Sequence, residues 1–208
     1  MDMLNARIAS LGATVVRFDL PEYDELLPAI ATDTLEAKAA LEKYFAALPK
    51  DAPIRTFGQL VVAKTATPSV QKTLETENAV QDGTNSAEYK TRMLNRDKLR
   101  LAVANKIAEL NLDAILYPHQ KILVVPVGAA DQAERNGTLS NGTGYPAVTF
   151  QAGFSAPTST APLGVPIGAE LLGLDFTEDK LLSYAFALEQ ASNPRKPPMS
   201  TPPLSGEP

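Results

Sequence analysis

Three short apolar segments in the second half of the chain restrict its fold most strongly. They are "LDAILYP" (112–118), "PAVTFQAGF" (146–154) and "VPIGAELLGL" (165–174). Each has the length and the aliphatic or aromatic content of a buried strand, and a proline lies at or next to one end of each. Helical patterns precede and follow them at 86–110 and 176–192. Interspersed helices and strands predict the α/β class.

The first half of the chain carries further signals. The sequence predicts helices over 1–11, 22–32, 33–49 and from Thr56 onward, and a buried strand over 14–21, "TVVRFDLP". Asp33 stands three residues before Glu36, which is the spacing of a capping box. Thr56 and Thr177 can each cap the helix that follows them. Residues 71–86 are polar and carry no clear pattern.

Composition excludes several functional classes. The chain has 208 residues, a net charge of −5, no cysteine and one histidine, His119. The negative net charge argues against a nucleic-acid binder. The lack of cysteine and the single histidine argue against a metal site. No apolar run reaches the roughly 18 residues of a membrane span, and the N-terminus is charged where a signal peptide is apolar. We expect a cytoplasmic protein with no cofactor and no membrane partner.

The segment 136–150, "NGTLSNGTGYPAVTF", admits several interpretations. Its residues 142–147 fit G-x-G-x-x-A, but a phosphate-binding loop follows a strand and opens a helix, whereas this segment leads into a strand. Asn136 and Asn141 head N-x-[ST] sequons, and the sequence leaves their glycosylation open. Ser140 lacks the G-x-S-x-G pattern of a nucleophilic serine. A turn that feeds a buried strand is the favoured interpretation.

His119 directly follows the predicted strand 112–118. Functional side chains of α/β folds gather at such strand ends. A Ser-His-Asp arrangement would have to use this residue, because the chain has no other histidine. The alternative is a histidine in a turn that makes one hydrogen bond. The residues alone leave both interpretations open.

Four motifs follow one another along the chain. They are "ARIASLGATVVRFDLP" (6–21), "NGTGYPAVTFQAGF" (141–154), "APLGVPIGAELLG" (161–173) and "TEDKLLSYAFALEQAS" (177–192), with "RKPP" after the last. The second contains N-x-x-G-x-P-A at Asn141, Gly144, Pro146 and Ala147. In this order they resemble the C-terminal part of amidase signature enzymes. "YPHQK" (117–121) is similar to a sub-branch in which Pro-His-Gln stands where other members have Pro-Thr.

The resemblance implies a fold and a chemistry. It implies an α/β/α sandwich around a mixed sheet flanked by helices, with 1–192 as a partial amidase domain and 193–208 as a proline-rich extended tail. Family members hydrolyse amides through two serines and a lysine, and the serines lie in a Gly-Ser-Ser-Gly-Gly-like run in the N-terminal half. This chain has no Ser-Ser and no Gly-Gly pair. We therefore expect no catalytic residue in it.

The resemblance also implies a role beside the substrate. This region would complete the sheet, line the cleft and be inactive alone. The cleft candidates are Tyr117, His119 and Gln120 after one strand, and Asn141, Gly144 and Tyr145 before the next; plain turn residues are the alternative. The expected partners are the N-terminal catalytic half, a small amide in the complete enzyme and, through an uncovered sheet edge, a second copy. The alternative function is a stand-alone binding or assembly module on an amidase-derived scaffold.

Overall fold

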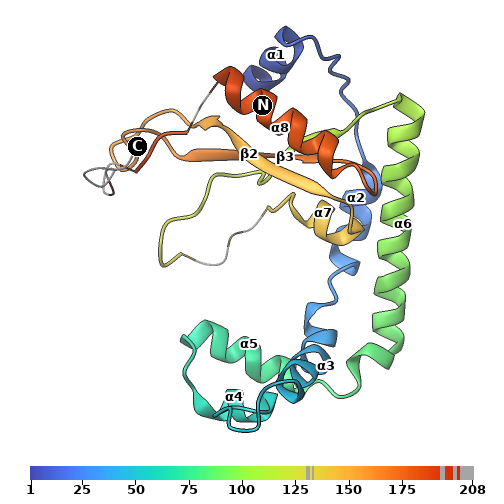
Figure 1. The fold of residues 1–208 in the computed structure, drawn as a ribbon, viewed down its shortest axis with the longest axis vertical. Coiled ribbons are helices and arrows are strands. Elements are labelled where there is room, and N and C mark those ends of the chain that lie inside the picture. The colour runs from blue at the N-terminus through green and yellow to red at the C-terminus, as the bar shows by residue number, and fades with distance from the viewer. Residues whose placement is uncertain (130–131, 133, 193–194, 199–200, 202–208) are drawn as a thin grey trace. The chain divides into compact units, whose positions relative to one another are not determined.

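The computed structural model describes residues 1–129, 132, 134–192, 195–198 and 201 (Figure 1). Its contacts divide the chain into two compact units, one of residues 1–20 and 102–208 and the other of residues 21–101. Helix α6 (Ala87–Leu110) contributes to both. The predicted domain division at residue 192 stays a prediction, because most of the tail 193–208 lies outside the described residues.

A sheet of three strands forms the centre of the first unit. Its strands are β1 (Ile115–Pro118), β2 (Ala147–Phe154) and β3 (Pro166–Leu172), in the order β1-β3-β2. They coincide with the three segments that the sequence predicts as strands, and the α/β class is confirmed. Every pair among these strands is antiparallel. The parallel pairs of a mixed sheet would therefore need strands beyond those described.

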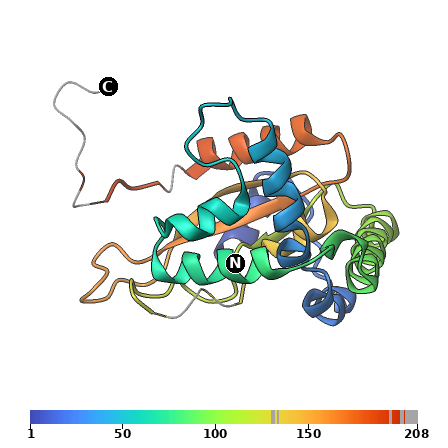
Figure 2. The ribbon, with the colours of Figure 1, turned by 90° about the horizontal axis from the view of Figure 1, so that it is seen from below.

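One face of this sheet carries a hydrophobic core. Helix α8 (Glu178–Ser192) lies along β2 and β3 in both views (Figures 1 and 2). Its Leu181 and Leu188 pack with Leu171 of β3. Partly buried side chains complete the cluster: Ile8, Ala114, Leu116, Val148, Phe150 and Tyr184. Burial of a leucine contributes about 1.5–3 kcal/mol, more than a capping residue does, so packing is the main reason for α8.

The ends of two of the helices of this unit follow the sequence in part. Helix α1 (Asp2–Ser10) stops before Gly12, whose φ of +96° favours glycine. Thr177 precedes α8, as predicted, and its carbonyl accepts the Leu181 N–H at 3.0 Å. Its hydroxyl, however, donates to the Leu174 carbonyl at 2.7 Å. Thr177 thus fastens the turn before the helix.

The predicted strand over 14–21 is wrong. Residues 13–20 have no regular secondary structure, and Pro21 opens helix α2 (Pro21–Leu26). Val15 and Val16 are 37% and 44% exposed. A strand needs a neighbour for its backbone N–H and C=O groups. Within the described ranges no strand pairs with this segment.

The second unit is helical. Besides α2 it contains η1 (Leu27–Ala29), α3 (Asp33–Ala46), α4 (Phe57–Ala63), α5 (Pro68–Ala79), η2 (Gly83–Asn85) and the first part of α6. The helices predicted over 33–49, from Thr56 and over 86–110 are confirmed. The helix predicted over 22–32 is confirmed only in part, because α2 and η1 end at Ala29. Helix α5 lies largely in the polar segment 71–86, where the sequence gives no clear signal. None of its residues is buried, so the helix has no buried apolar stripe from which the sequence could predict it.

Two predicted caps in this unit have different outcomes. Thr56 caps α4, because its hydroxyl accepts the Gln59 N–H at 3.1 Å. Asp33 is the first residue of α3 instead of its cap, so the predicted capping box is wrong. Thr32 precedes the helix, and its hydroxyl donates to the Glu36 carboxylate at 2.9 Å.

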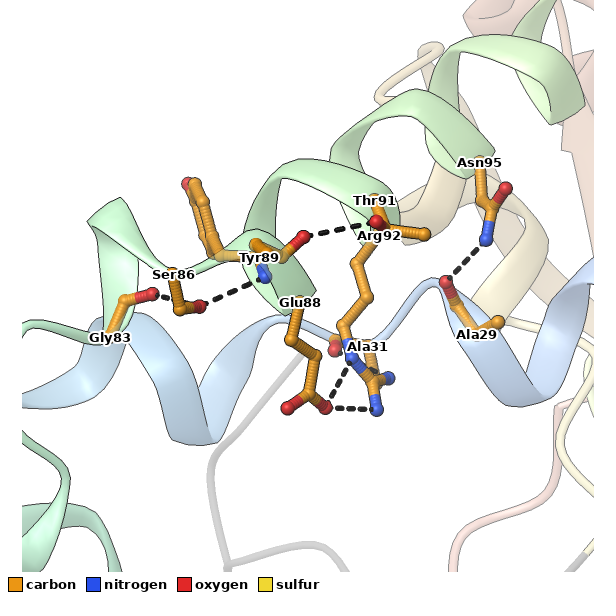
Figure 3. A network of polar contacts seen from close by, with 10 residues as sticks. Ala29, Ala31, Gly83, Ser86, Glu88, Tyr89, Thr91, Arg92 and Asn95 are labelled. Carbon is orange, nitrogen blue, oxygen red and sulfur yellow. Dashed lines mark hydrogen bonds and ion pairs between the residues drawn. The ribbon is translucent and has the colours of Figure 1, made fainter.

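Ser86 and two polar side chains anchor the start of α6 (Figure 3). The Ser86 hydroxyl accepts the Tyr89 N–H at 3.0 Å, which is an N-cap hydrogen bond. Arg92 donates both to the Glu88 carboxylate and to the Ala31 carbonyl, at 2.8 and 3.0 Å. Asn95 donates to the Ala29 carbonyl at 3.2 Å. The helix is thereby fastened to the segment that joins η1 to α3.

None of the helices among the described residues combines the length and the apolar character that crossing a membrane requires.

Candidate functional site: a buried acid and an exposed imidazole

Glu170, in the middle of the central strand β3, is the buried acid of the candidate site. Its side chain is 3% exposed. The Tyr117 hydroxyl donates to Oε1 at 2.7 Å, and Nδ1 of His119 lies 2.7 Å from Oε2. Oγ1 of Thr149 lies 3.5 Å from Oε2. A buried carboxyl group loses its hydration, and these three side chains supply hydrogen-bond partners in its place.

The strand register brings these side chains together. Tyr117 of β1 and Thr149 of β2 each lie directly opposite Glu170. His119 comes two residues after Tyr117, and its backbone N–H donates to the Gly168 carbonyl at 3.1 Å. Alternate residues of a strand point to the same face of a sheet. The four side chains therefore share the face opposite the one that packs against α8.

The chain between β1 and α7 (Thr138–Thr143) returns to His119. The backbone N–H groups of Asn136 and Gly137 donate to the His119 carbonyl at 3.0 and 3.2 Å. The Asn136 side chain donates to the Pro118 carbonyl at 3.0 Å. A Cβ at Gly137 would overlap the imidazole, lying 2.9 Å from both Nδ1 and Nε2. Backbone, ring contact and Glu170 thus fix His119, whose side chain stays 44% exposed.

The remaining cleft candidates follow β1 or lie in and after α7. Gln120 forms an isolated antiparallel bridge with Arg135. Asn141 lies within α7, Gly144 ends that helix with a φ of +68°, and Tyr145 is 8% exposed. The contacts with His119 described above come from Asn136 and Gly137, at the start of the segment.

The segment 136–150 therefore differs from the predicted turn. It contains the short helix α7, in which Leu139 and Thr143 are buried. The Thr143 hydroxyl donates to the Leu139 carbonyl at 2.8 Å. Burial of these side chains holds a helix in a sequence whose Asn, Gly and Thr residues locally favour turns. Only Gly144 to Pro146 form the turn that leads into β2.

Sequence reasoning missed Glu170 and Thr149 as members of the site. Glu170 does carry a signal: it is the one charged residue in an apolar strand segment, and charged residues are seldom fully buried unless paired. The contact of Gly137 with the imidazole has no sequence signal, because it joins two segments only after the chain has folded.

The arrangement resembles the acid–imidazole pair of hydrolases in one respect. A carboxylate at one ring nitrogen fixes the tautomer and orientation of the imidazole and leaves the other nitrogen available. In the described part of the chain, however, no serine or threonine hydroxyl contacts Nε2 of His119. A Ser-His-Asp mechanism therefore lacks its nucleophile among these residues. Nor do three or more His, Asp or Glu side chains gather as a metal site in the described ranges.

The fold and the site define an α/β protein with polar side chains gathered at a strand end. A family model, described as Amidase, matches residues 1–182, and the chain belongs to the amidase family. It is 28% identical to the indoleacetamide hydrolase of Agrobacterium vitis over 209 residues, covering 92% of this chain and 42% of that protein. It is also 28% identical to a probable amidase of Arabidopsis thaliana over 163 residues, covering 78% of this chain and 29% of that protein.

A solved structure agrees with this assignment. The native peptide amidase from Stenotrophomonas maltophilia superimposes with a TM-score of 0.73 and 25% sequence identity, covering 95% of this chain and 40% of the peptide amidase. The chain thus spans less than half the length of each of these relatives.

Proposed function

We propose that this chain is the non-catalytic C-terminal region of an amidase, an enzyme that hydrolyses amide C–N bonds. The observation that carries the proposal is the family match over residues 1–182, in a chain that covers only 42% of the indoleacetamide hydrolase and 40% of the peptide amidase. The sequence has no Ser-Ser and no Gly-Gly pair, so it lacks the run expected of the catalytic half. A serine needs a base and an oxyanion site beside it to attack an amide.

The order of the strands supports a role in completing a larger sheet. β1 and β2 lie at the two ends of the strand order of the described sheet. Edge strands present unpaired N–H and C=O groups to which another strand can pair. A strand from the catalytic half would satisfy these groups.

Exposed apolar side chains support the same partner. After β1 the chain carries Ile122, Leu123, Val124 and Val127, which are 46%, 46%, 59% and 107% exposed. Gathered apolar side chains of this kind mark surfaces that another protein covers. The partner we propose is the N-terminal catalytic half, in the same or a separate chain. Without it, the isolated chain self-associates.

The sheet face opposite α8 is the proposed wall of the substrate cleft. It carries Tyr117 and His119, and Gln120 follows directly. Asn141, Gly144 and Tyr145 lie where the chain approaches β2 and remain candidates for the same wall. The substrate of the complete enzyme would be a small amide.

A stand-alone binding module is the second candidate function. One observation favours it: the Glu170–His119 pair and its supporting contacts are complete within this chain. A site built without the catalytic half could bind a small molecule without turning it over.

The state of the purified chain separates these functions. The proposal predicts binding of a dye such as ANS to exposed apolar surface and self-association in sedimentation velocity. A monomer that binds no ANS and unfolds in one cooperative step would contradict the half-domain proposal and favour the module.

A further inference from the structure

The imidazole of His119 is held more firmly than a half-exposed turn residue requires. Its carbonyl accepts two N–H groups, from Asn136 and Gly137, and its own N–H donates to Gly168. The ring lies against the Cα of Gly137, where no Cβ would fit. Nδ1 lies 2.7 Å from a carboxylate that is 3% exposed. These restraints leave the ring little freedom to rotate.

The restraints also bear on which ring nitrogen faces a ligand, because Nδ1 is the nitrogen that contacts Glu170. A carboxylate that has no proton can only accept hydrogen bonds, and beside such a group Nδ1 is the ring nitrogen that carries a proton. Tyr117 donates to the other carboxylate oxygen and keeps the acid in its acceptor role. In the neutral ring, Nε2 is then the acceptor. The His119 side chain as a whole is 44% exposed, so part of the ring is accessible to a ligand.

We propose that His119 is a binding residue whose Nε2 accepts a hydrogen bond from the N–H₂ group of a primary carboxamide. Glu170, Tyr117 and Gly137 are the positioning residues that fix its tautomer and orientation. The choice of a carboxamide rests on the proposed amidase function, whereas the choice of tautomer rests on the contact between Nδ1 and Glu170. No proton is transferred and no bond is broken in this role.

The single histidine makes the first test direct. In a ¹⁵N-histidine-labelled chain every imidazole signal comes from His119. Two-bond ¹H–¹⁵N correlation spectra at about pH 8.5, well above the ordinary imidazole value of about 6.5, report which nitrogen carries the proton. We expect the Nδ1–H form to dominate, and Glu170→Gln to shift the population towards Nε2–H. Glu189→Gln, the same change at an exposed position of α8, should leave it unchanged. A dominant Nε2–H form in the unaltered chain overturns the proposal.

The second test needs no variant and addresses the ligand. Benzamide has an N–H₂ donor, whereas N,N-dimethylbenzamide keeps the ring and the carbonyl but has no N–H group. Addition of benzamide should move the Nε2 signal in a saturable way, and the dimethyl compound should not. Equal effects of the two compounds, or none from either, overturn the carboxamide site. Because neither spectrum depends on amide hydrolysis, loss of the amidase proposal would be seen separately, in an activity assay.

Discussion

Nδ1 of His119 lies 2.7 Å from Oε2 of Glu170 and joins the residue after β1 to the middle of β3. The acid is buried and the imidazole is half exposed, so the pair connects the interior of the sheet to its surface. This relationship ties Glu170 to the stability of the fold and to the role proposed for His119.

Glu170→Gln should lower the free energy of unfolding by about 1–3 kcal/mol, because a neutral amide makes weaker hydrogen bonds than a buried carboxyl group. A glutamine side chain has one acceptor oxygen, so it can keep Tyr117 and also pair with Nδ1 of His119 only through its N–H₂ group, after a change of tautomer. Urea unfolding followed by circular dichroism measures the change. Glu189→Gln, at an exposed site, should stay within about 0.5 kcal/mol. Equal stability of the two variants would contradict the role assigned to Glu170.

Gly137→Ala should destabilise the chain by about 1–3 kcal/mol, because the new methyl group overlaps the His119 ring. The double-mutant cycle with His119→Ala identifies the cause. In the His119→Ala background the ring is gone, so the added methyl group should cost much less. If Gly137→Ala costs the same with and without the imidazole, the ring contact is not what position 137 requires.

Gly83→Ala should destabilise the helical unit 21–101 by a similar amount, about 1–3 kcal/mol. A Cβ at Gly83 would overlap the Leu35 carbonyl of α3 and lie 2.8 Å from Cγ1 of Val80. The matched control is Gly58→Ala in α4, where nothing except its neighbour Thr56, at 3.9 Å, comes near the new methyl group. There we expect no loss, since alanine favours a helix. Melting of the helical signal at 222 nm compares the two; similar losses would contradict the close approach of η2 to α3.

Tyr89 should make stability depend on alkaline pH. Burial, followed by the hydrogen bond to Glu36 and the charge of Glu36, raises the pKa of Tyr89 above its ordinary value of 10.0. A pKa that is higher in the folded chain contributes stability below the unfolded value, and this contribution is lost as pH rises through the folded value.

Tyr89→Phe tests this dependence. The urea midpoint of the unaltered chain should fall more steeply between about pH 9 and pH 11 than that of Tyr89→Phe. Lys180, whose pKa is also raised, by its hydrogen bond to Asp113, is present in both proteins and cancels in the comparison. Parallel pH profiles for the two proteins would show that Tyr89 does not couple to folding.

The sequence predicts those parts of the fold whose cause is local. The three strands follow from apolar runs next to prolines, and α6 follows from the helical pattern over 86–110. The strand over 14–21 fails because β-structure depends on a neighbour, which no local pattern supplies. The sequence does not predict helix α7, because its composition is typical of a turn. The burial of Leu139 and Thr143, which depends on the folded chain, overrides that local preference.

The candidate site, like the fold, is predictable from the sequence only where its cause is local. The rule that polar side chains gather at strand ends finds Tyr117 and His119. It does not find that Tyr117, Glu170 and Thr149 lie in one row, because that row depends on the register of three strands. Whether Gln120, Asn141, Gly144 and Tyr145 line a substrate cleft stays a prediction.

Release of ammonia from a primary carboxamide by the purified chain tests the central claim most directly. If the chain is the non-catalytic region of an amidase, the rate equals that of buffer and does not change in His119→Ala. Saturable turnover that His119→Ala abolishes would show that this chain is itself a hydrolase working through its one histidine, and would contradict the account.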